Sequence, residues 1–433
     1  MRSVKIEIRP ISRAEAVDYL KVLPFANGLP NWEPAPAAWH GGPEAWPPPN
    51  NPATDQQLES WADEVMADHF HPQAAFADGK LVGGSAMISM AITVPGLGSV
   101  PFGGVTATGV IATHRRRGLL RAMMQAMFDE ALGRGEPLAA LSASEGGIYG
   151  RYGFSPATMR SRWELERSAA TFLDQEQPPG SLELVDAAAA RLAWPEIHEQ
   201  LRGRQVGELT PQPDQWAGLT DDAVGTGGPM RYLVHRDRNG NLDGVANFRL
   251  PWSPTPEHAG TLVVDGFQTV SMDAYRAMWM LLTDFDLTRK VVAASRPTDE
   301  PLRWLLRDPR AMRITRQADN LWLRILDLPK ALTARSYECA AELTIAIDVD
   351  DMCPHNVGVW QLMVGPEGAS CAPTGKQPDL TMDIQALGSL YLGGMSAALL
   401  AAAGRIRAHR SGALADLTRV FRCDPAPFNS FGF

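Results

Sequence analysis

The chain has 433 residues, 45% of them hydrophobic and 21% charged, and its formal net charge is −9. This length exceeds what one hydrophobic core supports, so we expect about three domains. The negative charge argues against a nucleic-acid partner, because a phosphate backbone requires a basic footprint on the protein. An acidic surface would instead attract a cationic substrate, although acidity often serves solubility alone.

The N-terminal residues lack the apolar core of a signal peptide, and the apolar run Ala397 to Ala403 is too short to span a membrane. We therefore expect a cytoplasmic protein without a membrane partner. His69 and His71 lie two residues apart, but no third clear ligand is near them, so no metal site is predicted. None of the cysteines forms a CxxC pair, and reduced thiols are expected at Cys339, Cys353, Cys371 and Cys423.

The first third of the chain alternates strand and helix signals. Helical patterns at Ser12 to Val22 and at Leu58 to Phe70 flank a long Pro- and Trp-rich stretch, Asn27 to Asn51. From Gly118 to Gly133 the apolar residues again recur with helical spacing. Strands are expected at Val4 to Ile8, Ala75 to Ala77, Leu81 to Val94, Val100 to Ile111 and Pro137 to Ser142.

The middle of the chain echoes the same order of elements. A helix capped by Ser271 is expected after the third strand of this part. The pattern alone leaves open whether this is a repeated fold, and at Val270-Ser271 it has neither Gly nor Arg to cradle a phosphate. Strands are expected at Tyr232 to Arg236, Asp243 to Leu250, Thr261 to Val270 and Val291 to Ala294.

From about Ala331 onwards, strands precede helices. The strand patterns are Leu343 to Val349 and Val357 to Val364, and the helical patterns are Ile384 to Arg405 and Ala413 to Phe421. This order is typical of an α+β domain.

The segment Val110 to Arg121 joins a strand to a helix and carries four arginines within seven residues. Backbone N–H groups at a helix start lack partners, and together with the helix dipole they bind anions such as a pyrophosphate. Gly118 allows a close approach of the backbone, and arginine grips phosphate through paired hydrogen bonds. The alternative is a solvated basic helix start. The segment has neither GxxxxGK[ST] nor GxGxxG, so a Walker loop and a dinucleotide fingerprint are both excluded.

Arg115-x-x-Gly118-x-Leu120 resembles the Arg/Gln-x-x-Gly-x-Gly/Ala loop of the GNAT superfamily of N-acetyltransferases, with Leu120 in place of the final small residue. The strings Thr113 to Met123 and Ala143 to Phe154 resemble, more narrowly, the enhanced intracellular survival (Eis) family of bacterial acetyltransferases. This resemblance implies acetyl-CoA as the cofactor and a homo-oligomer, a hexamer.

The resemblance also implies the fold class, an α/β chain of tandem GNAT-like domains followed by an α+β domain similar to sterol carrier proteins. The expected boundaries are a catalytic GNAT domain at 1–160, a second GNAT-like domain without a cofactor loop at 161–330, and the third domain at 331–433. The expected cofactor-binding residues are Thr108, Gly109, Val110, Arg115, Arg116, Arg117, Gly118, Leu119, Leu120, Arg121, Ser144 and Glu145.

Amine acetylation requires a base for the amine proton, donors for the developing oxyanion and an acid for the departing thiolate. Tyr149 follows the flexible Gly146-Gly147 pair, where a loop can bring its hydroxyl to the cofactor. From the residues alone, packing is the commoner role of a tyrosine. The resemblance makes Tyr149 the general acid, with Tyr152 as the second candidate.

The last six residues contain three phenylalanines, which favour burial over a frayed end. Burial raises the proton affinity of a carboxylate. The resemblance implies that the α-carboxylate of Phe433 is the base, and the alternative is a hydrophobic anchor without chemistry. Gly432 adds no negative charge where some relatives place an acidic residue.

The substrate pocket is the least defined part of the site. The long loop offers rings for cation–π contact and carboxylates for ammonium groups, or equally a surface that packs against another subunit. Its candidate substrate-binding residues are Trp32, Glu33, Trp39, Glu44 and Trp46. The expected function is N-acetylation of small cationic amines, aminoglycosides by resemblance. The alternatives are Nε-acetylation of protein lysines and lipid or sterol binding through the third domain.

Overall fold

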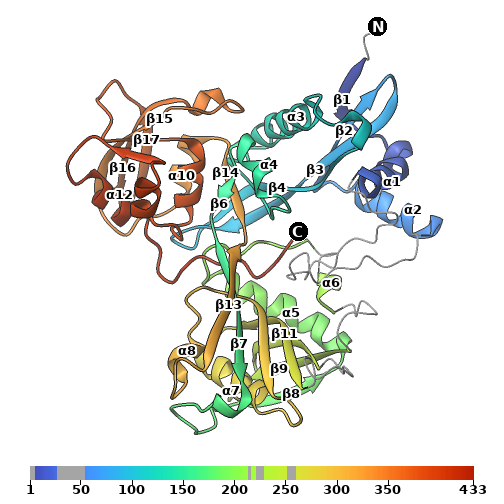
Figure 1. Ribbon diagram of the computed structural model, residues 1–433, viewed down its shortest axis with the longest axis vertical. Coiled ribbons are helices and arrows are strands. Elements are labelled where there is room, and N and C mark those ends of the chain that lie inside the picture. Colours follow the sequence, from blue (N-terminus) through green and yellow to red (C-terminus); the bar gives the residue numbers. More distant parts are fainter. Residues whose placement is uncertain (1–4, 27–53, 213–215, 221–228, 251–259) are drawn as a thin grey trace.

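The computed structural model describes residues 5–26, 54–212, 216–220, 229–250 and 260–433. Figure 1 shows three lobes, each built on one sheet: the first lobe at the upper right, the third at the upper left and the second below them. Within these ranges, no helix combines the length and the apolar character needed to cross a membrane.

The first sheet is covered by helices on both faces. Alternate residues of β2 point to opposite sides: Ala74 and Phe76 pack with α1 (Ala16–Ala26) and α2 (Asp55–Glu64), while Ala75 and Ala77 pack with α3 (Leu119–Gly133). In sheet order the strands are β1 (Ile6–Pro10), β2 (Phe70–Ala77), β3 (Lys80–Thr93), β4 (Ser99–Val110), β5 (Leu138–Leu141), β14 (Trp322–Ile325) and β6 (Ser155–Pro156).

The expected helix from Leu58 to Phe70 was wrong at its C-terminal end. Helix α2 stops at Glu64, and Phe70 begins β2, where it is paired with Ile88 of β3. Phe70 continues the apolar pattern of the helix but is the first residue of a strand, so the pairing between strands overrides the local pattern.

The second sheet repeats the plan of the first and confirms the second GNAT-like fold. Ala246 and Phe248 of β10 pack towards α7 (Met272–Thr283), whereas Val245 packs towards α5 (Ala187–Arg202). Two short helices, α6 (Ala217–Thr220) and α8 (Leu302–Leu305), complete this lobe. In sheet order the strands are β13 (Met312–Asp319), β7 (Met159–Glu166), β12 (Lys290–Arg296), β11 (Thr261–Thr269), β10 (Leu242–Arg249), β9 (Met230–Arg236) and β8 (Ser181–Val185).

Strand β14 crosses back from the second lobe to the first. It pairs with β5 through Trp322 and Leu141 and with β6 through Leu323 and Ser155, although the expected second domain runs from 161 to 330. Its side chain Arg324 is fully buried and forms an ion pair with Asp350 of the third lobe. Strand β14 therefore completes the first sheet although it follows the second lobe in the sequence, so a single boundary near residue 160 cannot separate the two lobes.

The third lobe has a five-stranded sheet in the order β17 (Gly368–Pro373), β16 (Gly358–Gly365), β15 (Ala341–Ile347), β18 (Leu380–Met382) and β19 (Ile406–Ala408). The expected helix from Ile384 to Arg405 was wrong, because it is divided into α10 (Ile384–Tyr391) and α11 (Ala397–Ala402), and Arg405 lies beyond both. Gly393 lies between the two helices with φ +88°, where an added Cβ would meet Cys423 at 2.5 Å. The remaining helices are α9 (Leu328–Ala334) and α12 (Ala413–Phe421).

Candidate active site

The site is organised by the end of pairing between β4 and β5. These parallel strands pair from Phe102–Leu138 to Gly104–Ala140, after which β5 ends at Leu141 while β4 continues to Val110. The register of β4 against β3 also shifts in this stretch, where Ala107 has φ +50°. We call the end of pairing, after Gly104 and Ala140, the fork.

The loop after β4 has the geometry of an anion site. Helix α3 begins after Gly118, which has φ +79° and provides no side-chain cap, so the first amides of the helix are left for a ligand. A Cβ added at Gly118 would meet no atom within 4 Å, so the space beside it is open. Arg116 also has a positive φ of +62° in this exposed loop. The residues fit the pyrophosphate of acetyl-CoA.

Three of the loop arginines contact backbone oxygens. Arg115 Nε donates to Val110 O at 3.1 Å, and Arg117 Nη2 donates to Thr113 O at 3.1 Å. Arg121 Nη2 donates to Asp351 O of the third lobe at 3.3 Å. These contacts shape the loop, and Arg121 links α3 to the third lobe.

Tyr149 lies at the end of the short helix α4 (Gly146–Tyr149), and the side chains of Ser144 and Thr108 lie near its hydroxyl. Burial raises the pKa of this hydroxyl above its ordinary value, and the neighbouring hydroxyls of Ser144 and Thr108 oppose that rise only in part. Thr108 is held in turn by Ser85 of β3, with 2.7 Å between the hydroxyl oxygens. The Tyr149 side chain therefore lies beside β4 beyond the fork.

Phe433 reaches the other face of β4. Its ring packs edge-on against Phe102 with 6.1 Å between centroids, and a Cβ added at Gly104 would lie 2.7 Å from it. Gly103 faces the opposite way, towards Met87, in the cluster that also packs Tyr149. The last residue of the sequence and the candidate acid therefore flank β4 from opposite faces of the sheet near the fork. Figure 1 shows this end of the chain between the first and second lobes.

Comparisons with known proteins agree with this architecture. Models of the acetyltransferase (GNAT) domain match residues 44–157 and 207–325, and a model of the sterol carrier protein domain matches residues 328–430. An uncharacterized N-acetyltransferase of Streptomyces avermitilis is 35% identical over 82% of this chain and 86% of its own. The N-acetyltransferase Eis of Mycobacterium tuberculosis is 34% identical over the same shares of the two chains. The crystal structure of Eis1 from Mycobacterium abscessus matches with a TM-score of 0.81 at 30% identity, covering 99% of this chain and 100% of that one.

The chain belongs to the Eis family of GNAT N-acetyltransferases. It is therefore an N-acetyltransferase that uses acetyl-CoA, and its order of two GNAT domains and a sterol-carrier-like domain is that of the fold class expected from the sequence.

The other expected site residues differ in how the structure places them. Tyr152 is buried, in the cluster of Phe128 and Phe154, a position suited to packing. Glu145 is exposed and precedes α4. The five expected substrate-binding residues lie outside the described residues: Trp32, Glu33, Trp39, Glu44 and Trp46.

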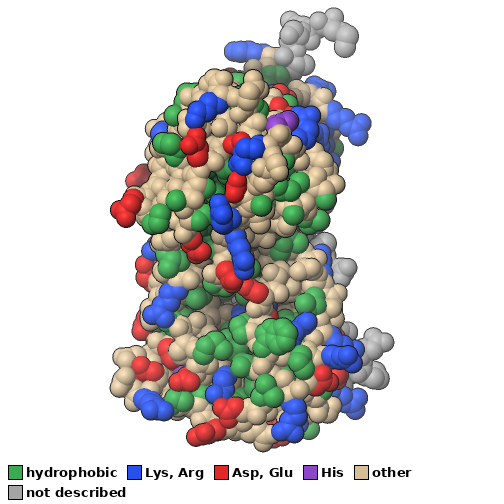
Figure 2. Space-filling view, turned by 90° about the vertical axis from the view of Figure 1, so that its left-hand side faces the viewer, with side chains coloured by type: hydrophobic (Ala, Val, Ile, Leu, Met, Phe, Trp, Pro, Cys, Tyr) green, Lys and Arg blue, Asp and Glu red, His purple; other side chains and the backbone are tan. Residues whose placement is uncertain are grey.

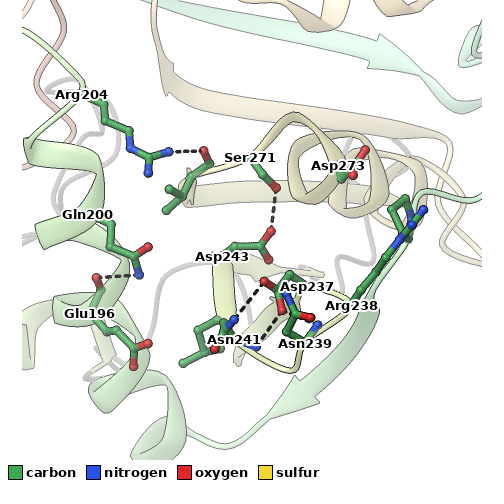
Figure 3. Close-up of a pocket in the computed structure, with 13 residues that line it drawn as sticks. Glu196, Gln200, Arg204, Asp237, Arg238, Asn239, Asn241, Asp243, Ser271 and Asp273 are labelled. Atoms are coloured by element: carbon green, nitrogen blue, oxygen red, sulfur yellow. Dashed lines mark hydrogen bonds between the residues drawn. The ribbon is translucent and has the colours of Figure 1, made fainter.

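The second lobe has a pocket of about 590 Å³ where β11 runs into α7, the place that corresponds to the cofactor loop of the first lobe (Figure 3). Here Ser271 caps the helix: its Oγ accepts a hydrogen bond from Ala274 N at 3.0 Å and donates one to Asp243 at 2.6 Å. Asp273 adds a carboxylate in the first turn. Arg204 and Arg238 also line the pocket, but a side chain already caps this helix and the carboxylates of Asp243 and Asp273 lie at its start, which disfavours a pyrophosphate there.

Sequence reasoning missed the residues that hold the C-terminal segment. Glu208 contacts Ser430, and Asn320 Nδ2 donates to the backbone oxygen of Asn429 at 2.8 Å. Neither Glu208 nor Asn320 lies in a motif, and each is more than a hundred residues from its partner in the sequence, so no local signal marks them.

A charge reversal in the loop tests the cofactor site. The double substitution Arg116→Glu with Gly118→Asp places carboxylates where the pyrophosphate would lie, so we expect acetyl-CoA binding to be lost by calorimetry while the thermal unfolding temperature stays close to that of the parent. The matched control, Arg238→Glu with Asn239→Asp, makes the same kind of change in the second-lobe pocket and should leave affinity unchanged. Unchanged affinity in the loop variant would show that acetyl-CoA binds elsewhere.

Proposed function

We propose that this enzyme acetylates amino groups of small cationic molecules, with aminoglycosides as the class that the family resemblance suggests. The observation that carries the proposal is Tyr149, which lies near Ser144 and Thr108 beside a strand fork and an open, arginine-rich helix start. The net charge of −9 supports a cationic substrate. The face in Figure 2 mixes positive and negative side chains and presents no uniformly basic field that a nucleic acid would need.

In this proposal Tyr149 is the general acid and the α-carboxylate of Phe433 is the general base. The raised pKa of Tyr149, caused chiefly by burial, keeps the hydroxyl protonated at neutral pH, as an acid requires. The position of Phe433 against Gly104 supports the second role, because it brings the last residue of the sequence to the fork from the face opposite Tyr149.

Bound acetyl-CoA supplies a thioester, whose C–S bond breaks as the C–N bond of the product amide forms. The carboxylate on Phe433 takes the proton that the attacking amine must lose. The Tyr149 hydroxyl gives its proton to the departing sulfur, and proton exchange with solvent restores both groups.

The third lobe gives no support to a lipid- or sterol-binding function. The side chains of Leu387, Tyr391 and Phe421 are buried together in the core of this lobe. Arg335 is buried beside them, its guanidinium 4.9 Å from the ring centroid of Phe421, and it donates to Tyr391 O. A buried cation is costly in a cavity meant for an apolar ligand. The hexamer and the cytoplasmic location stay predictions.

A thiol-release assay with acetyl-CoA tests the substrate class. We expect release of CoA with aminoglycosides, and an acetylated product by mass spectrometry, at rates well above those with polyamines or lysine peptides. Hydroxylated analogues without amino groups serve as the control and should give only background release. A preference for lysine peptides would replace the proposed substrate with protein lysines.

The substitution Tyr149→Phe tests the acid. It removes one hydroxyl and little volume, so acetyl-CoA affinity and KM should change little, while kcat should fall about 100-fold. Tyr152→Phe is the matched control, because it removes the same atom from a ring in the same hydrophobic cluster. If the Tyr149 variant retains kcat within about twofold, Tyr149 does not act in proton transfer.

A further inference from the structure

Glu208 binds the C-terminal segment three residues before its last residue. Its carboxylate accepts hydrogen bonds from Ser430 N at 3.1 Å and from Ser430 Oγ at 3.0 Å, and its side chain is fully buried. Three residues span at most about 10 Å of chain, so a fixed Ser430 restricts where Phe433 can lie.

Glu208 is itself attached to the catalytic sheet. Thr93 N donates to Glu208 O at 2.8 Å, and Gly207 N donates to Thr93 O at 2.8 Å, at the end of β3. At the residue before Gly207, Phe428 N donates to Val206 O at 2.9 Å, so the same segment also holds the tail by its backbone. Hydrogen bonds therefore connect Ser430, through Glu208, to the sheet that contains the fork.

The second lobe completes the cradle of the tail. Gln268 Nε2, from β11, donates to Ser430 Oγ at 2.5 Å and contacts His198 Nδ1 at 2.9 Å. The ring of Phe431 is buried in the core of the second lobe and packs against the rings of His198 and Trp216 at 6.2 and 5.3 Å. The tail thus occupies the seam between two lobes and contacts both.

A buried carboxylate is an unfavourable group to place here. Burial raises the pKa of Glu208, which means that its charged form is disfavoured there. Its removal alone would leave Ser430 N and Oγ without this acceptor. What the carboxylate supplies is two directed hydrogen bonds to one residue of the tail.

We propose that Glu208 is a positioning residue for the acetyl transfer: by fixing Ser430 it sets the place of the Phe433 carboxylate at the fork. This inference rests on the proposed role of Phe433 as the base. In this proposal the second GNAT-like lobe holds the C-terminal tail in place for the first lobe, through Gln268 and the core residues that surround Phe431.

The test compares Glu208→Met, which removes both acceptor oxygens, with Glu208→Gln, which keeps one. We expect kcat of the Met variant to fall about 100-fold, the effect of displacing a catalytic group by about 1 Å, with KM and acetyl-CoA affinity nearly unchanged. Glu208→Gln should retain most of the activity. Glu164→Met, which breaks a pair with Lys290 elsewhere in the second lobe, controls for general damage and should retain kcat. A Met variant with full kcat would overturn the positioning role, and so would an equal loss of kcat in the Gln variant.

The same substitution in a lengthened chain distinguishes a failure of this inference from a failure of the proposed base. Two glycines added after Phe433 move the carboxylate but leave every side chain in place, so turnover should be lost if that carboxylate is the base. Glu208→Met in the lengthened chain should then cause no further fall of the residual rate, because both changes act through one group. Full turnover of the lengthened chain would overturn the base itself. A further fall in the double variant would overturn only the role of Glu208.

Ser430→Ala, which removes one of the two hydrogen bonds, should show an intermediate loss of kcat if the inference holds, and an unchanged kcat would count against it.

Discussion

The short pairing between β4 and β5 is the constraint on which the site depends. Three residue pairs join the strands, and beyond Gly104 and Ala140 β4 continues without β5 beside it. The residues proposed for acetyl transfer lie at the fork and along this continuation. Gly104, at the fork, is beside Phe433, Thr108 is beside Tyr149, and the strand leads into the open start of α3. If pairing with β5 continued to Val110, the backbone N–H and C=O groups on that edge of β4 would be engaged in the sheet.

The two GNAT lobes share a plan but treat the corresponding helix start differently. In the first lobe Gly118 leaves the amides of α3 without a side-chain cap, whereas in the second Ser271 caps α7 and Asp243 holds Ser271. The backbone amides at the helix start are therefore available to an anion in the first lobe, whereas in the second lobe the Ser271 side chain caps the helix. The second lobe also contacts the C-terminal tail through Gln268 and the core residues around Phe431.

Local chemistry made much of this predictable. The loop Val110 to Arg121 and the string around Tyr149 are contiguous, so their spacing was visible in the sequence, and α3 followed from its apolar periodicity. Long-range pairing was not visible. Phe70 belongs to a strand because it pairs with Ile88. Gly393, with φ +88°, lies between two helices where Cys423 leaves no room for a Cβ, and Trp322 joins a sheet whose other strands come from before residue 157. The contact of Glu208 was not predictable for the same reason, because its partner Ser430 lies 222 residues away in the sequence.

We propose that acetyl transfer takes place at the fork of the first lobe. A crystal structure of the protein with acetyl-CoA or a non-reactive thioether analogue tests this location most directly. We expect the pyrophosphate on the amides from Arg116 to Arg121, the acyl group beside β4 just beyond Gly104, and the sulfur within hydrogen-bonding distance of the Tyr149 hydroxyl. A cofactor bound at the start of α7, or a sulfur on the far side of the sheet from Tyr149, would contradict it.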